Sequence, residues 1–87
     1  MSKPEFGINP SNAVMERRHF IHGEIDTTIG LDRLYWQIID GLCRWRHISW
    51  EHWAIKHLNS KPENVGRARW LRNAVVVETV IYRRMWA

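Results

Sequence analysis

The stretch from Ile25 to Trp36 constrains the fold more than any other part of the chain, because its hydrophobic period changes partway along. Up to Leu31, apolar and polar residues alternate, which is typical of a strand with one buried face. From Asp32 onward the apolar residues recur every three to four positions, which predicts an amphipathic helix. The sequence therefore predicts a short strand that runs directly into a helix, with Asp32 as the helix N-cap.

This strand has no evident partner nearby in the sequence. A lone strand leaves two rows of unpaired backbone groups, and the simplest remedy is antiparallel pairing with the same strand of a second copy. One row of side chains would then face a shared core and the other row would face outward. The expected dimer core consists of Ile25, Thr27, Ile29, Leu31 and Trp36, and the outward row consists of Asp26, Thr28 and Gly30.

Three helices are expected after the strand, so the fold class is mainly α. The first spans residues 33–46, and Ser49 is the expected N-cap of the second. The second ends before Pro62, because proline cannot continue the helical hydrogen bonds. The third covers roughly residues 64–82 and is apolar on two sides, which predicts that it is buried between other elements. Its segment 74–82 is rich in β-branched residues, so a strand is the alternative there.

The N-terminal residues 1–16 contain prolines, a glycine and small polar residues without periodicity, and we expect a flexible arm ahead of a domain over residues 17–87. Residues 16–22 are ambiguous and could extend the ribbon, with Gly23 at a bend or bulge. The 87-residue chain carries thirteen Lys and Arg against nine Asp and Glu, which favours a polyanionic partner such as nucleic acid. So small a core also favours dimerisation.

Several functional classes are disfavoured. Cys43 is the single cysteine, so no Cys-based metal cluster is expected, and a reduced cytoplasmic compartment fits best. No apolar run has the length of a signal peptide or a membrane span. The five histidines lack the spacing of metal ligands. No nucleophile elbow, phosphate loop or carboxylate pair is present, so we expect neither an enzyme nor a cofactor.

The residues around the strand resemble a known motif. In a bacterial ribbon-helix-helix family common in alphaproteobacteria, Arc- and MetJ-like in fold, the core reads Thr-Ser-Ile-Ser-Leu-Glu and then an aromatic-Trp pair. The matching positions here are Thr27, Thr28, Ile29, Leu31, Asp32, Tyr35 and Trp36. The resemblance extends loosely over residues 17–80. It implies a homodimer whose two-stranded ribbon enters the DNA major groove, and hence a small transcriptional regulator, most simply a repressor.

The resemblance also indicates which residues would contact double-stranded DNA. The candidates for base contact are Asp26, Thr28 and Glu24, and the candidates for phosphate contact are Arg17, Arg18, Arg44, Arg46 and Ser49. The chain departs from the family at Asp26, where the family has Arg, and at Gly30, where it has Ser. A carboxylate can accept from a cytosine amine, but it cannot pair with guanine as Arg does.

The rival hypothesis is a protein-binding module on the same dimeric fold, such as an antitoxin-like protein or a phage-type inhibitor of a host protein. The six tryptophans bear on it. We expect Trp36, Trp45, Trp50 and Trp53 in the core, and Trp70 and Trp86 in a surface patch for a partner. Basic surface on both sides of the ribbon would support the regulator, whereas an exposed patch without a basic ribbon would support the module.

Overall fold

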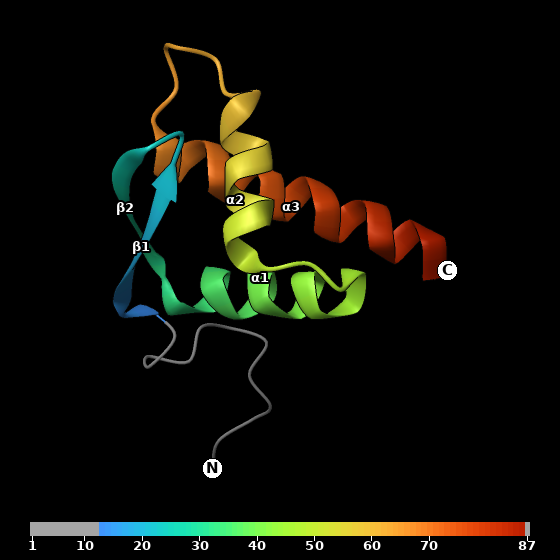
Figure 1. The fold of residues 1–87 in the computed structure, drawn as a ribbon. Coiled ribbons are helices and arrows are strands. Elements are labelled where there is room, and N and C mark those ends of the chain that lie inside the picture. The colour runs from blue at the N-terminus through green and yellow to red at the C-terminus, as the bar shows by residue number, and fades with distance from the viewer. Residues whose placement is uncertain (1–12, 87) are drawn as a thin grey trace.

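A computed structural model describes residues 13–86, with side chains as far as residue 81. The elements in chain order are β1 (Met15–His22), β2 (Ile25–Asp32), α1 (Arg33–Arg46), α2 (Trp50–Asn59) and α3 (Arg67–Trp86). The two strands form one antiparallel sheet, and the three helices lie on the same side of it (Figure 1). The proposed arm lies mostly outside the described residues, although its last two residues belong to β1.

The prediction that β2 has no nearby partner is wrong, because β1 pairs with it within the same chain from Met15 opposite Asp32 to His22 opposite Ile25. A two-residue turn joins the strands, with φ of 57° at Gly23 and 71° at Glu24. Two successive positive φ values are those of a type I′ turn, whose twist matches that of a hairpin. Residues 16–22 therefore form a strand, as considered from the sequence, but they pair with β2 through a tight turn at Gly23 and do not continue it past a bend or bulge.

The inward row of β2 packs on the helices of its own chain. Thr27, Ile29 and Leu31 are at most 5% exposed and join Trp36 in a single core. These four expected dimer-core residues therefore owe their burial to contacts within one chain. Ile25, the fifth, is 64% exposed at the turn end of the hairpin. A second copy is thus unnecessary to explain the alternation of β2.

The helix boundaries follow their local signals. The predicted bounds of α1 are confirmed, and α2 ends before Pro62 as expected. Ser49 caps α2, because its side chain accepts a hydrogen bond from the backbone N–H of His52 at 3.1 Å. Asp32 precedes α1 but makes no side-chain cap bond. Residues 74–82 are helical, so the strand alternative is wrong.

Two expectations about burial are wrong. The first half of α3 packs on the core with one face only, and its second apolar stripe is exposed, because the helix extends past the elements that could cover it (Figure 1). Trp36 and Trp53 are buried and Trp50 is partly so, but Trp45 is 51% exposed in the last turn of α1. None of the helices combines the length and apolar composition that crossing a membrane requires, over the residues described.

Candidate nucleic-acid interface

The outer face of the hairpin is the surface that could contact DNA, because the helices cover the other face. Pairing positions opposite each other share a face, and the side chains of this face come alternately along both strands. They belong to Met15, Arg17, His19 and Ile21 of β1 and to Asp26, Thr28, Gly30 and Asp32 of β2. The predicted outward position of Asp26 and Thr28 is confirmed, and both residues are exposed.

His19 connects the two candidate base-contact residues of β2. Its Nδ1 lies 3.1 Å from the Thr28 hydroxyl, directly across the strand pair. Its Nε2 lies 3.6 Å from a carboxylate oxygen of Asp26, its diagonal neighbour. The imidazole thus places a polar group, cationic when protonated, beside the carboxylate that seemed least suited to a DNA-facing surface. Glu24, the third candidate, is exposed at the tip of the hairpin, outside this group.

Arg17 is the arginine of the outer face, and the absence of a side chain at Gly30 leaves space for it. A Cβ on Gly30 would stand 2.8 Å from Met15 Sδ and 3.5 Å from Arg17 Cγ, so these β1 side chains lie over the bare glycine. No carboxylate lies within ion-pair distance of Arg17 among residues 13–81. Glycine thus stands where the family has serine, and the side chain of Arg17, on the neighbouring strand, lies over this glycine.

Arg18 is a structural residue, and its side chain lies on the other face of the hairpin from Thr28, so the outer face does not include this predicted phosphate contact. Neighbours in a strand point to opposite faces, so Arg18 faces the helices. It forms a two-pronged pair with Asp40 at 2.7 and 2.8 Å, and its guanidinium carbon lies 4.6 Å from the ring centre of Trp36 and 5.2 Å from that of Trp50. The hydrogen bonds to Asp40 raise the pKa of Arg18. This arginine anchors β1 to α1.

The remaining phosphate candidates lie away from the outer face of their own chain. The axis of α1 leads away from the hairpin (Figure 1), and a rise of 1.5 Å per residue places Arg44 about 16 Å beyond the start of the helix. Arg46 pairs with Glu78 at 3.0 Å. Ser49 precedes Trp50, whose ring packs against Phe20 on the inner face at 5.6 Å between centroids. One chain therefore does not bring these three residues together with Thr28.

Charge is distributed unevenly along the fold. The hairpin, residues 15–32, carries two arginines against four carboxylates. Residues 61–86 carry six Lys and Arg against two glutamates. The basic surplus of the chain therefore lies in the α2–α3 loop and α3, and the ribbon does not have the continuous basic surface that would by itself indicate DNA binding.

Glu78 forms a buried cluster that the sequence analysis missed. Its residue is 8% exposed, and its carboxylate accepts from Trp53 Nε1 at 2.8 Å and from Arg46 at 3.0 Å, with His57 Nε2 at 2.9 Å. These contacts join α3 to both α1 and α2. The sequence did contain a signal for this cluster, because Glu78 interrupts a run of β-branched residues in α3. A charged residue buried among apolar ones requires polar partners. No group of potential metal ligands occurs in the described part of the chain.

Comparison with known proteins identifies no similar site, because no family model, curated protein or solved structure matches the chain significantly. Its chemistry must therefore be judged from the geometry. Cys43 offers no reactive group, because burial in α1 raises the pKa of its thiol to about 11 and thereby keeps it protonated near neutral pH. The outer face of the hairpin offers hydrogen-bond donors and acceptors, which suits recognition of a partner.

Proposed function

We propose that the protein binds double-stranded DNA as a homodimer, with a sheet of four strands in place of the two-stranded ribbon expected from the sequence, and acts as a small regulator. The observation that supports this best is the outer edge of β2, which pairs with no other strand among residues 13–86 and is called its free edge below. In a two-residue hairpin the flanking His22 and Ile25 form a hydrogen-bonded pair, and such pairs alternate along the strands. The bond from Arg33 N to Val14 O, 2.9 Å, continues this alternation beyond the hairpin. The backbone groups of Thr28 consequently point away from β1.

Pairing of this edge with β2 of a second copy would give a sheet ordered β1-β2-β2-β1. With strands 4.7–4.9 Å apart, the two outer strands would lie about 14 Å from each other. The B-DNA major groove is about 12 Å wide. The two copies of Asp26 and Thr28 would therefore lie over the base edges, and Arg17 of each β1 would reach the phosphates on either side.

Each residue then has a defined role. The Thr28 hydroxyl can donate to or accept from a base, and its methyl can contact thymine. Asp26, next to His19, can accept from a cytosine amine. Arg17 supplies the phosphate contact that fixes the ribbon over the groove. Occupying an operator blocks transcription without any catalytic group, so repression is the simplest mode of action.

Fluorescence anisotropy tests this proposal with labelled duplex from upstream of the gene and a scrambled duplex, each titrated at several salt concentrations. We expect about a thousand-fold preference for the native duplex. Arg17→Ala should reduce the slope of log affinity against log salt by about two, one contact from each protomer. Arg44→Ala is the matched control and should leave the slope unchanged. Equal and weak binding to both duplexes would refute the proposal.

The dimer is tested separately with proline, which removes one backbone N–H. Thr28→Pro would remove a donor from the free edge of β2 while sparing the hydrogen bonds to β1. His19→Pro, directly opposite, would remove a donor from the outer edge of β1 and serves as the control. In sedimentation velocity we expect dimers for the wild type and His19→Pro, and monomers for Thr28→Pro. A monomeric wild type would refute pairing through β2.

The exposed stripe of α3 favours a second candidate function, a protein-binding module. A contiguous apolar surface on a small protein commonly marks an interaction site, and the ribbon lacks a basic surround. The two functions use different surfaces, the hairpin for DNA and α3 for protein. Substitutions on one surface should therefore leave binding at the other intact.

A further inference from the structure

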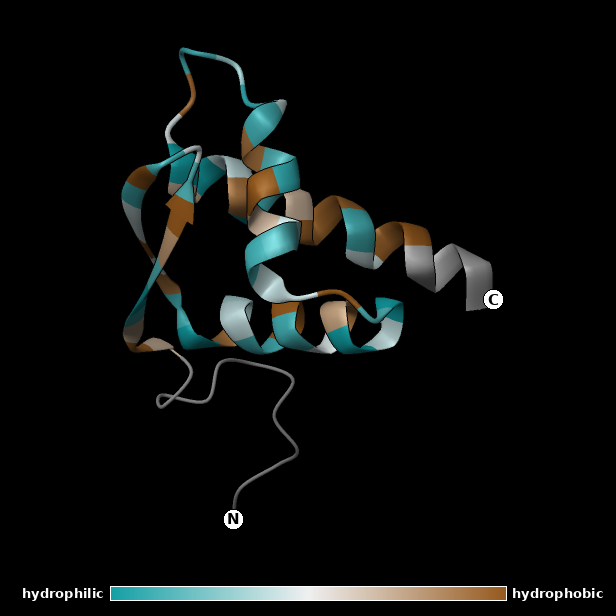
Figure 2. Cartoon of the chain, viewed as in Figure 1, coloured by the Kyte–Doolittle hydropathy of each residue, from teal (hydrophilic) through white to brown (hydrophobic). Residues whose placement is uncertain are grey.

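The outward side of α3 carries an unusual number of exposed aliphatic side chains. Val76, Val77, Val80 and Ile81 are 54, 48, 45 and 49% exposed, and we call these four residues the α3 apolar face. Their spacing places them on one side of the helix. The opposite side, with Leu71 and Val75, is buried in the core. Figure 2 shows hydrophobic residues on the part of α3 that extends past α2.

A hollow of about 330 Å³ adjoins this face. It is lined by Asn64, Val65, Arg69, Trp70 and Asn73. Positions 69, 73, 77 and 81 form one row along the helix, four residues apart, so Asn73 of the hollow is one turn from Val77 of the α3 apolar face. Trp70 is held in place, because its Nε1 donates to the backbone oxygen of His57 at 2.8 Å. The surface thus combines an apolar stripe with a polar, aromatic pocket at its N-terminal end.

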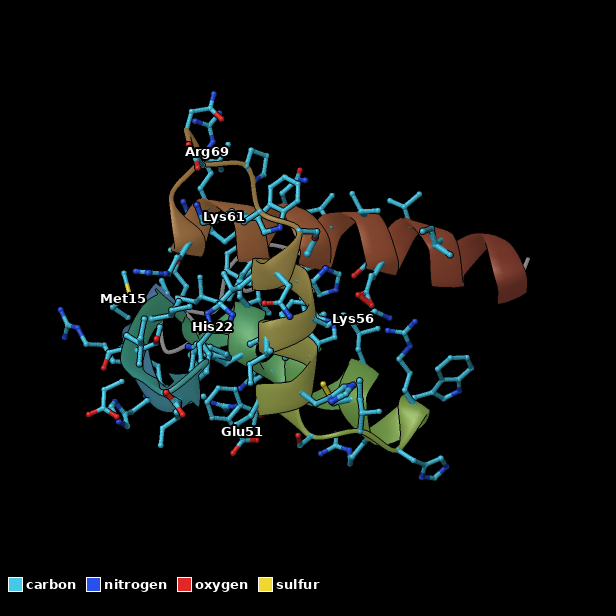
Figure 3. The ribbon with its side chains drawn as sticks, turned by 45° about the horizontal axis from the view of Figure 1, so that its top comes forward. Met15, His22, Glu51, Lys56, Lys61 and Arg69 are labelled. Atoms are coloured by element: carbon cyan, nitrogen blue, oxygen red, sulfur yellow. The ribbon has the colours of Figure 1, made fainter. Side chains whose placement is uncertain are left out.

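The charged residues of α3 are nearly all basic. The sequence of α3 contains five arginines and a single glutamate. That glutamate is Glu78, which is buried and bonded to α1 and α2, so it contributes nothing to the outward side. Arg69 is exposed at the mouth of the hollow. Figure 3 shows Arg69 at the start of α3 and Lys61 in the preceding loop, whereas Met15 lies on the hairpin.

We propose that the α3 apolar face and its hollow bind an acidic, amphipathic helical segment of another protein. This names the partner of the protein-binding function proposed above and rests on that function. Apolar side chains of the segment, three and four residues apart, would pack on Val77 and Val80 in the manner of a helix in a groove. A carboxylate two or three turns along the segment would pair with Arg69 beside the hollow.

Charge and area argue against a second copy as the occupant. Two α3 helices packed side by side would bring like-charged surfaces together, which is unfavourable. Four half-exposed aliphatic side chains also offer roughly 300 Å², well below the 800 Å² per partner of a standard-size interface. A single short helix needs less area, and a negative charge on it would remove the repulsion.

A display selection tests the proposal without assuming a sequence. Random peptides long enough for four helical turns are selected on the full-length protein after depletion on Val80→Glu, which places a carboxylate in the α3 apolar face. We expect enriched peptides with net negative charge and apolar residues three and four positions apart. A representative peptide should lose at least tenfold in affinity with Val80→Glu and with Arg69→Glu. Ile21→Glu is the control, because Ile21 is an aliphatic residue on the hairpin that is 61% exposed, and it should change nothing.

The outcomes separate this inference from the function on which it rests. Enriched peptides that are basic or uncharged and still depend on Val80 would refute the acidic partner while supporting a protein-binding module. No enrichment would refute both. A change from dimer to monomer with Val80→Glu would assign the face to a second copy. Co-sedimentation of the wild type, but not of Val80→Glu, with phosphatidylserine vesicles would assign it to a membrane surface. Either result would overturn the proposal.

Discussion

Replacing Glu78 by glutamine should destabilise the fold more than the same replacement of a carboxylate by an amide at any other Glu or Asp among residues 13–81. The carboxylate joins three side chains from two helices: Trp53 and His57 of α2 and Arg46 of α1. An amide has nearly the same shape, so the substitution removes charge and one acceptor without creating a cavity. Packing is preserved, and the change in stability reports the polar contacts.

The expected cost is worked out contact by contact. The amide oxygen can still accept from Trp53, so that bond costs little. The contact with His57 loses an ionised acceptor, and hydrogen bonds to charged groups contribute about 1.5–3 kcal/mol. The pair with Arg46 is discounted to under about 1 kcal/mol, because its side chain is 34% exposed. The sum is about 1.5–4 kcal/mol, which is a large part of the ~5–15 kcal/mol typical of small domains.

Urea unfolding followed by tryptophan fluorescence measures this cost, since Trp53 contacts the substituted group. For a domain of this size, each kcal/mol lowers Tm by about 4–8 °C, so Tm should fall by at least about 6 °C. Glu63→Gln in the α2–α3 loop is the control, because Glu63 is exposed. A loss below about 1 kcal/mol for Glu78→Gln would show that the cluster does not hold α3 in place.

Three further outcomes follow from the geometry. Arg18→Lys keeps the charge but loses the two-pronged pair with Asp40 and the contact with two indole rings, so the urea midpoint should fall, with a cost of about 1–2 kcal/mol. Glu24→Gly relieves a positive φ of 71° in the turn and should stabilise the fold by about 0.5–1 kcal/mol in the same assay. Cys43, with a pKa of about 11, should be about 0.1% thiolate at pH 8. Iodoacetamide should therefore modify its thiol slowly in the native protein and rapidly in urea. Fast labelling of the native protein would contradict the burial of this thiol.

The helices α1 and α2 were predictable because their signals are local. A regular hydrophobic period identifies each, Ser49 marks the start of α2, and Pro62 limits its end. The outward position of Thr28 followed equally from the alternation of β2. These inferences need only residues close together in the sequence, and tertiary contacts did not override them.

Strand β1 was harder to recognise because its inward positions include Glu16 and Arg18, which break the apolar alternation. Arg18 can face inward only because Asp40 lies opposite, 22 residues along the chain, together with the indole rings. No local pattern reveals such a pair. The turn adds to the difficulty, since Glu24 adopts a positive φ that is usual for glycine and asparagine. The exposure of the α3 apolar face was missed for a similar reason: an apolar stripe predicts burial, and only the extent of the other elements determines whether anything covers it.

The salt dependence of DNA binding distinguishes the hairpin from α3 as the DNA-binding surface. If only the two Arg17 side chains of a dimer contact phosphates, affinity should fall about tenfold between 50 and 200 mM salt. Six or more phosphate contacts would instead lower it by a factor of about 10³ or greater. A dimer would carry ten arginines in its two α3 helices and four in its two hairpins. A shallow slope with strong sequence preference therefore supports the ribbon, whereas a steep slope without preference places the DNA on α3 and leaves the hairpin for a protein partner.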